Sequence, residues 1–365
     1  MNTPGAPRHG PVEPTELVVL TGFLGSGKTT LLAAYLQQPQ AADTAVIVNE
    51  VGEIDLDGAV LSSTAAKVPM ALLSNGCVCC AIGSDLPGTI AMLIEDRAER
   101  GLPPLARIVL ETSGLSRPGP VLRSLGPLAA HLRVCVVSTF DCERGPDTLA
   151  LPEAAAQIAG AQRIVLTRQD IAGPGAVAAA SALLARINPL AELVREAAPA
   201  ARALASLAPL ASSVGVDRMD GIERIPQEGL DAESAEDQQA HARIRTGLCR
   251  FDAPVDHDAL AEWLDNLAGL CGERLLRVKG LVDVKGLSRP LLVQSVGTLF
   301  APLVPLAART PDRFLVVIVR DMALDALRSV QPLLPFVLTS TARDIRLPGR
   351  PLGRPLRTVL SEACA

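Results

Sequence analysis

TGFLGSGKTT, residues 21–30, follows the apolar run LVVL at residues 17–20, and this stretch decides the fold. It matches the pattern G-x-x-x-x-G-K-[ST], with a buried strand predicted before it and a helix after it. Glycines let the backbone curl so that successive N–H groups and the start of the helix face an anion. The sequence therefore predicts a phosphate-binding loop and a nucleotide site. Its predicted members are Gly22, Gly25, Ser26, Gly27, Lys28, Thr29 and Thr30.

Two side chains of this loop predict how the phosphates are held. Lys28 is expected at the β and γ phosphates, and Thr29 is expected to ligate Mg²⁺. The chain has 34 Lys plus Arg, of which only four are Lys. A compact ammonium fits inside a tight loop where a wide guanidinium fork does not. The lysine at position 28 is therefore the residue that this chemistry requires.

Length and composition bound the function class. The 365 residues suggest two domains, each with enough chain to bury a core. A net charge of −5 and a pI near 5.5 give no electrostatic reason to expect a nucleic-acid partner. No apolar stretch is long enough to span a bilayer, and the Pro-rich start lacks a signal-peptide core, so we expect no membrane partner and a cytoplasmic protein. The eight Cys are then expected as thiols, and a cluster of them suggests metal binding or redox chemistry.

Short β-branched runs alternate with helical stretches along the first two thirds of the chain. This alternation predicts βαβ units and an α/β fold with a doubly wound, mostly parallel sheet. An aromatic content of 2% means that the core is built mainly from Ala, Val, Leu and Ile. The predicted strands are ELVVL at 16–20, AVIVN at 45–49, ARIVLE at 106–111, RVCVVST at 133–139 and RIVLT at 163–167.

A polar segment divides the chain. Residues 217–240 hold eight Asp or Glu against two Arg, which is typical of an interdomain linker. After it, strand-like and helix-like stretches in the order β-α-β-β-β-α predict a smaller α+β domain with helices on one face, in which Trp263 is a core residue. The expected parts are a lead at 1–15, a P-loop domain at 16–215, an acidic linker at 216–240, a C-terminal α+β domain at 241–340 and an Arg/Pro-rich tail at 341–365.

The segment ETSGL, residues 111–115, follows a predicted buried strand, where a second nucleotide-sensing segment is expected. Glu111 would hold magnesium through water, and Gly114 would present its N–H to the γ-phosphate. With Lys28 and Thr29, Glu111 completes the set of candidate catalytic residues. The alternative is an ordinary turn in which Ser113 or Ser116 caps a helix.

TRQD, residues 167–170, stands where guanine-binding P-loop proteins commonly have N/T-K-x-D. The set predicted to contact the base is Thr167, Arg168 and Asp170. Asp170 would accept two hydrogen bonds from the guanine base. Arg168 replaces the expected lysine, and its planar guanidinium could stack on the base. The alternative is a turn in which Asp170 caps the next helix.

SNGCVCCAIGSDL, residues 74–86, carries three thiols within four residues. Cys77, Cys79 and Cys80 form a soft-ligand cluster suited to zinc or copper(I). A turn this tight does not readily close a tetrahedral site alone, so a fourth ligand comes from elsewhere or is exchangeable. Glu50 and Glu53 in VNEVGEIDLDG are the candidates. The alternative is three buried structural cysteines.

GFLGSGKTT, NEVGEIDLDG, NGCVCC, ETSGLSRP and TRQD, in this order and spacing, resemble the CobW family of metallochaperone GTPases. EWLDNL, RVKGLVDV and QSVGTLF resemble the C-terminal domain of the same family, so the resemblance covers residues 16 to about 335. It implies a G domain of the SIMIBI type, with GTP or GDP and Mg²⁺ bound and slow intrinsic GTP hydrolysis. It also implies that Cys77, Cys79 and Cys80, with Glu53 as a partner, bind Zn²⁺ or Co²⁺ for transfer to a client protein.

This chain differs from the family pattern at three positions and in one segment. Val51, Arg117 and Arg168 stand where the pattern has Phe, Asp and Lys, and a His-rich stretch near the linker is reduced to His241. We therefore expect no metal-storing arm. The sequence leaves open the physiological metal, the client, the residue that activates water and the oligomeric state, a homodimer being one option.

Three hypotheses follow. In the first, GTP orders the segment from Glu50 to Asp57, which completes the thiol site, and hydrolysis loosens the metal. In the second, the protein is a nucleotide-dependent regulator or assembly factor, such as a cobalamin-pathway accessory protein, with a structural metal and a client docked on the C-terminal domain. The Cys79→Ala variant separates them, since a structural site would lose thermal stability and a transfer site would lose GTP-dependent metal release. A small-molecule P-loop kinase is the third, and it leaves the CVCC cluster unexplained.

Overall fold

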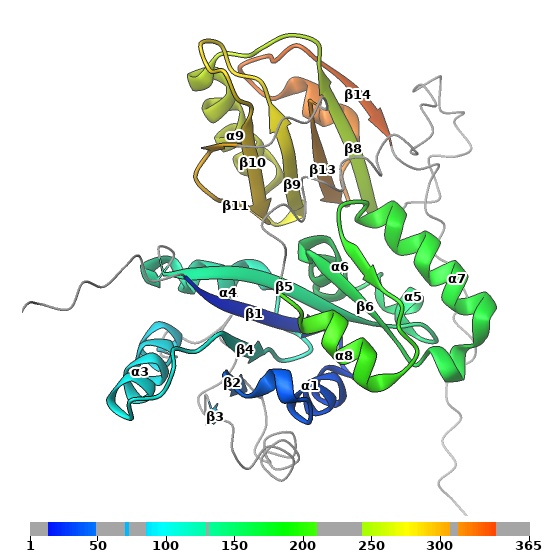
Figure 1. Cartoon of the computed structure of the whole chain (residues 1–365). Helices are drawn as coiled ribbons and strands as arrows, with labels where there is room; N and C mark the ends of the chain where they lie inside the picture. The colour runs from blue at the N-terminus through cyan, green and yellow to red at the C-terminus, as the bar shows by residue number, and fades with distance from the viewer. Residues whose placement is uncertain are drawn as a thin grey trace, which may run out of the picture.

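The computed structural model describes residues 14–48, 70–72, 85–128, 131–209, 243–306 and 313–340. Two sheets organise this part of the chain, and Figure 1 shows them one above the other. The first sheet belongs to the segment with the predicted phosphate loop. The second belongs to the segment after the acidic stretch.

The first sheet has seven strands in the order β3-β2-β4-β1-β5-β6-β7, and every described pair is parallel. The β-branched runs form its centre because both faces of a parallel sheet are buried. The predicted phosphate loop leaves the end of β1, the central strand. The strands are β1 Thr15–Gly22, β2 Thr44–Val48, β3 Met70–Leu72, β4 Arg107–Glu111, β5 Leu132–Asp141, β6 Arg163–Thr167 and β7 Glu192–Val194.

Helices cover both faces of this sheet, as a doubly wound fold requires. Leu17 and Val19 of β1 face one hydrophobic cluster that includes residues of α3, α4, α6 and α7. Val18 and Leu20 face a second cluster with residues of α1 and α8. The helices are α1 Lys28–Leu36, α3 Leu86–Glu99, α4 Pro118–Ser124, α5 Gly145–Thr148, α6 Pro152–Gly160, α7 Gln169–Ile187 and α8 Pro199–Leu207, with 3₁₀ turns η1 Pro39–Ala41 and η2 Gly126–Leu128.

Helix α7 is the one helix in the described ranges that is long and apolar enough to cross a membrane, by length and composition only. One helix of this kind is weak evidence, because helices of soluble cores pass the same test. Its backbone is non-helical at Gly173, just before Pro174, and its buried residues Ala180, Leu184 and Ile187 pack in the core of the first sheet.

The second sheet is antiparallel, with the order β11-β10-β9-β13-β8-β14 and β12 paired to β10. Its outer face packs against α9 and η6, which places the helical elements on one face as expected. The elements are β8 Ile244–Phe251, α9 His257–Cys271, η5 Gly272–Arg274, β9 Leu275–Val282, β10 Leu291–Val296, β11 Leu299–Phe300, β12 Val304–Pro305, β13 Phe314–Arg320, η6 Leu324–Ser329 and β14 Phe336–Ser340.

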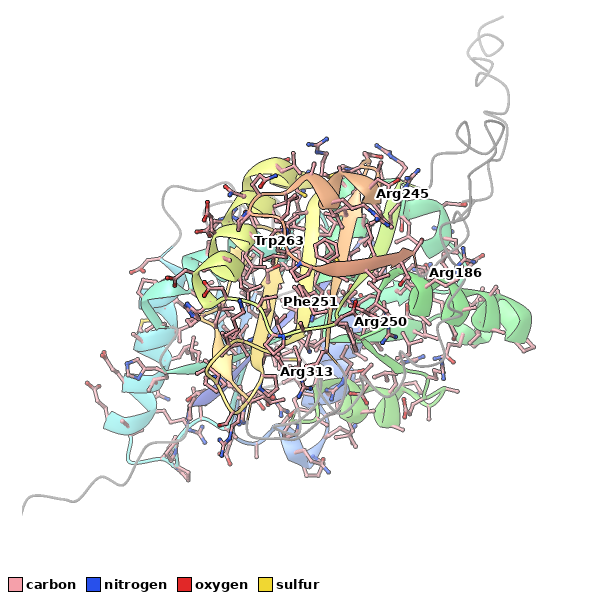
Figure 2. All side chains as sticks on the ribbon, turned by 90° about the horizontal axis from the view of Figure 1, so that it is seen from above. Arg186, Arg245, Arg250, Phe251, Trp263 and Arg313 are labelled. Carbon is pink, nitrogen blue, oxygen red and sulfur yellow. The ribbon has the colours of Figure 1, made fainter. Side chains whose placement is uncertain are left out.

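Helix α9 has residues at both ends that favour a helix start and a helix stop. The Asp256 carboxylate accepts hydrogen bonds from the N–H groups of Asp258 and Ala259, and Gly272 follows the helix with a φ of 53°. Trp263 is fully buried and lies 5.7 Å from the Phe336 ring, which confirms it as a core residue. Figure 2 looks down on this domain and shows Trp263 on α9 and Phe251 on β8.

The inner face of the second sheet packs on the first domain. Residues of β8, β9 and β13, such as Leu248, Leu276 and Val316, belong to the same hydrophobic cluster as α6 and α7. The Thr246 hydroxyl donates to the Ile187 carbonyl at 2.9 Å. The domains therefore share one continuous core, as their close approach around α6 and α7 in Figure 1 suggests.

Several elements differ from the sequence prediction. The stretch DALRSVQPLL, residues 325–334, stands where the last helix of the order β-α-β-β-β-α is expected, and it forms only the 3₁₀ segment η6 because Pro332 and Pro335 prevent its continuation. The strand β14 that follows was not predicted. Strands β3 and β7, of three residues each, and β12, of two, were also missed. The acidic linker lies outside the described residues.

Candidate nucleotide-binding site

The predicted phosphate loop has the backbone that its glycines allow. Gly22, Gly25 and Gly27 have φ values of 142°, 71° and 91°, a region that L side chains rarely adopt. A Cβ at Gly22 would lie 2.2 Å from the Thr139 hydroxyl of β5, so the loop packs directly on the neighbouring strand. The Ser26 hydroxyl bonds the same Thr139 hydroxyl at 2.6 Å. These contacts fix the loop at the carboxyl edge of the sheet.

Lys28 is the first residue of α1 and its side chain turns back over the loop. Its ammonium donates to the Gly22 carbonyl at 3.0 Å, and the residue is 8% exposed. The ammonium therefore lies inside the curve of the loop. This is where the negative charge of a phosphate would be neutralised.

Thr29 and Glu111 come together although they are far apart in sequence. The Thr29 hydroxyl donates to the Glu111 carboxylate at 2.6 Å, and Glu111 is buried at the end of β4. A hydroxyl and a carboxylate are the hard oxygen ligands that Mg²⁺ prefers. The pair fits the magnesium role predicted for Thr29 and Glu111. Thr30 is in the first turn of α1 and is exposed.

The segment after β4 touches the phosphate loop. A Cβ at Gly114 would lie 2.7 Å from the backbone nitrogen of Leu24, so only glycine fits there without a shift. The Thr112 N–H donates to the Leu20 carbonyl at 3.0 Å. Helix α4 starts after Arg117 with no side-chain cap, so neither Ser113 nor Ser116 plays the capping role of the alternative interpretation.

Gln157 of α6 holds this sensing segment in place. Its buried side-chain amide donates to the carbonyls of Gly114 and Ser116, both at 2.9 Å. Its side-chain oxygen accepts no hydrogen bond from the described residues. Sequence reasoning missed Gln157, since a glutamine within an Ala-rich helix carries no motif.

TRQD forms the junction between β6 and α7. The Thr167 hydroxyl donates to the Ser26 carbonyl at 2.8 Å, which ties this junction to the phosphate loop. Arg168 adopts a φ of 52°, and its guanidinium lies 3.2 Å from the Asp141 carboxylate. Asp170 is exposed in the first turn of α7 and is not its N-cap, so the capping alternative does not describe it.

A cavity of about 240 Å³ lies beside the phosphate loop. Gly25, Ser26, Asp141, Arg144, Gln157 and Arg168 are among the residues that line it. Asp141 also accepts hydrogen bonds from the N–H groups of Glu143 and Arg144. Sequence reasoning missed Asp141, although an acid that ends a buried run was the signal that identified Glu111.

The predicted thiol site falls outside the described residues. Cys77, Cys79, Cys80, Glu50 and Glu53 all lie there. Within the described ranges, no group of three or more His, Cys, Asp or Glu side chains is arranged to hold a metal. The four described cysteines, at 135, 142, 249 and 271, are free and buried, and burial raises the pKa of each thiol, to about 12 for Cys135.

The sheet nevertheless fixes where the two undescribed segments begin. Val48, the last residue of β2, pairs with Glu111 on one side and with Leu72, the last residue of β3, on the other. The chain therefore leaves β2 and β3 at the level of Glu111. The segments with Glu53 and with the three cysteines both begin at the sheet edge that carries the phosphate loop.

Comparisons with known proteins agree with this geometry. A family model described as the CobW/HypB/UreG nucleotide-binding domain matches residues 16–195, and one described as the cobalamin synthesis protein cobW C-terminal domain matches residues 244–330.

Two relatives of known name cover most of this chain. The zinc chaperone YjiA of Escherichia coli (strain K12) is 28% identical over 299 residues, which are 80% of this chain and 88% of YjiA. The zinc chaperone CobW of a Sinorhizobium species is 28% identical over 310 residues, which are 76% of this chain and 84% of that protein.

A crystal structure of Zn(II)-bound YjiA GTPase from E. coli has the same fold. It superposes with a TM-score of 0.60 at 23% identity and covers 87% of this chain and 98% of that chain. At this identity the likeness shows the fold alone.

Proposed function

This chain belongs to the CobW family of P-loop GTPases, and from that premise we propose that it is a GTP-dependent metallochaperone. It would bind a transition metal, zinc first of all, and hand it to a client protein according to the nucleotide state. One observation carries the proposal. The Thr29–Glu111 pair lies beside Val48, after which the segment with Glu53 begins. Val48 pairs on its other side with Leu72, after which the segment with the thiols begins.

The phosphate loop supplies the groups that GTP requires. Lys28 would neutralise the β and γ phosphates, and the N–H of Gly114 is the candidate contact to the γ-phosphate. Thr29 and Glu111 would hold Mg²⁺, which would neutralise charge on the phosphate oxygens. Gln157 keeps the segment from Gly114 to Ser116 against the loop. These residues bind and orient the substrate, and we propose slow intrinsic hydrolysis to GDP and phosphate.

Guanine is the proposed base. Asp170 is exposed at the start of α7 and makes no hydrogen bond through its side chain to the described residues, so its carboxylate is available to accept from the base. Thr167 fixes the junction to the phosphate loop. Arg168 is held by Asp141, and stacking on the base would require this ion pair to open or to tilt.

The cargo site is proposed at Cys77, Cys79 and Cys80, with Glu53 as a switch partner. Thiolates are soft ligands that suit zinc and also accept cobalt(II). The names of the relatives YjiA and CobW specify zinc for those proteins, which favours zinc here. The proposed location is the cytoplasm, where thiols stay reduced, and the described cysteines are all free.

An anaerobic zinc titration tests the coupling. We expect zinc affinity to differ between protein loaded with a non-hydrolysable GTP analogue and protein loaded with GDP, and the Cys77/Cys79/Cys80→Ser variant to lose this site. The Cys364→Ser variant is the matched control, because Cys364 has no partner thiol in the sequence. Equal affinities with the analogue, with GDP and without nucleotide would contradict the proposed coupling.

A further inference from the structure

A second cavity lies between the two domains, away from the phosphate loop. Its volume is about 410 Å³, and it shares no lining residue with the cavity beside that loop. One wall is formed by α4 and the start of α6. The other is formed by η5 and by the turn after β10. A space of this size accommodates a small molecule.

Positive charge dominates the lining of this interdomain cleft. Arg117, Arg123, Arg274 and Arg320 line it, and Glu273 is the one acid among the lining residues. Arg274 is occupied by the carbonyls of Leu270 and Cys271 at the end of α9. The other three guanidinium groups are the candidates to meet a ligand.

Arg117 lines the cleft and forms two ion pairs of different strength. Its guanidinium lies 3.0 Å from the Glu153 carboxylate of α6 and 3.1 Å from that of Glu273 in the second domain. Glu273 is 88% exposed, so this second contact is weak and is readily exchanged for another anion. Arg117 directly follows Ser116, whose carbonyl bonds Gln157.

Arg320 lacks enough negative charge around it. Its side chain is only 13% exposed, its Nε makes no hydrogen bond to the described residues, and its one close carboxylate, that of Asp321 at 3.3 Å, also serves Arg243. Burial, reinforced by the neighbouring Arg243 and Arg117 and opposed by Asp321 and Glu153, lowers the pKa of Arg320. A mostly buried guanidinium whose charge is poorly compensated destabilises the protein, and an anion in the cleft would compensate that charge.

Arg123 lies in the last turn of α4, is exposed, and forms no ion pair with the described residues. Together with Arg117 and Arg320 it brings three guanidinium forks to one cleft. Guanidinium groups match phosphate and carboxylate oxygens in a bidentate geometry.

We propose that this cleft binds a small oxyanion with at least two negative charges, carried by phosphate or carboxylate groups. Arg320 and Arg123 bind it from the two domains, and Arg117 turns from Glu273 toward it. Such a ligand bridges α4, next to the nucleotide-sensing segment, and β13 of the second domain. The site is distinct from the proposed GTP and metal sites and stands independently of them.

The test is calorimetric titration of the full chain, saturated with GDP and Mg²⁺ so that the phosphate loop is filled. Inorganic phosphate and tricarballylate are the two probes, and they separate a phosphate source from a carboxylate source. Each titration is repeated in the Lys28→Ala background, where binding at the phosphate loop is weakened. We expect at least one of the two probes still to bind the Lys28→Ala protein.

The variants place the binding in the cleft. Losing one charge-assisted hydrogen bond should lower the affinity for the probe about tenfold. We therefore expect Arg320→Gln and Arg123→Gln each to lower this affinity about tenfold. Arg328→Gln is the matched control, since Arg328 is exposed in the same domain and pairs with Asp325. Arg123 is exposed, so its variant tests the site even if Arg320→Gln fails to fold.

Any of three results would overturn the proposal. One is the absence of binding by both probes in wild-type protein. Another is binding that is unaffected by Arg320→Gln and Arg123→Gln. The third is binding that disappears with Lys28→Ala alone, which would assign the anion to the phosphate loop.

Discussion

At the scale of single residues, Gly114 lies against the backbone of the phosphate loop with no room for a side chain. A Cβ there would lie 2.7 Å from the Leu24 nitrogen and 2.8 Å from its Cα. Those atoms are backbone, so they cannot rotate away as a flexible side chain would. Either the loop or the sensing segment has to move.

We therefore predict that Gly114→Ala weakens GDP binding about tenfold or more. Overpacking of this kind costs about 1 to 3 kcal/mol, and about 1.4 kcal/mol corresponds to tenfold in affinity. Fluorescent GDP titration measures the effect. Gly126→Ala is the control, because a Cβ at Gly126 meets nothing within 4 Å and its φ is not positive. If both variants bind GDP like wild type, the close approach at Gly114 has no role in the site.

Some residues of the candidate site could be predicted from the sequence and others could not, for a physical reason. The glycines, Lys28 and Thr29 belong to one contiguous motif, since one loop must curl around one anion. Asp141 and Gln157 act through contacts with residues that are distant in sequence, Arg168 for one and Gly114 for the other. No local sequence pattern encodes such pairs, so they can be identified only from the three-dimensional structure.

At the scale of elements, α6 connects the site with the second domain. Near its middle, Gln157 holds the sensing segment. At its end, the Arg277 guanidinium of β9 donates to the carbonyls of Ala159, Gly160 and Ala161. These are carbonyls that a helix end leaves unsatisfied, and a cation there also interacts favourably with the helix dipole.

The prediction for this element is that Arg277→Met lowers the free energy of unfolding by about 1 to 3 kcal/mol, because buried carbonyls lose a charged donor. Asn188 donates to two of the same carbonyls, so part of their hydrogen bonding remains in the variant and the decrease in stability is smaller. Urea denaturation measures it, with the exposed Arg328→Met as control. A midpoint for Arg277→Met equal to that of the control would show that this cap contributes nothing.

The strands show the limits of pattern recognition at this scale. The five runs rich in β-branched residues were found because burial on both faces demands an unbroken apolar stretch. Strands β3 and β7 have three residues each and lie at the two edges of the sheet, where such a stretch is not required. The last helix predicted for the C-terminal domain forms only the 3₁₀ segment η6, because Pro332 and Pro335 follow it.

At the scale of the whole molecule, the domain interface contains a lysine with an unusual titration. Lys279 lies two residues from Arg277 on the same face of β9, and it is buried. Burial, reinforced by Arg277, lowers the pKa of Lys279 to about 7. The unfolded chain therefore binds a proton at Lys279 between about pH 7 and the ordinary lysine pKa, where the folded chain does not.

Stability should accordingly rise with pH in that window. Below about pH 7 both states are protonated and the folded state carries the full penalty of a buried charge. Lys279→Met removes the penalty, so its advantage over wild type is largest near pH 6. It shrinks toward pH 9, with a limiting slope of about 1.4 kcal/mol per pH unit. Urea denaturation at several pH values measures this, and parallel profiles for the two proteins would refute it.

The shared core has a consequence for how such chains diversify. Leu248, Leu276 and Val316 pack with residues of α6 and α7 in one cluster, and Arg277 closes the end of α6. The C-terminal domain therefore cannot be exchanged between relatives by recombination without disturbing this core. In a chimaera, the facing side chains of the two domains would come from different proteins and would not pack together. We therefore expect substitutions at these facing positions to be correlated among relatives.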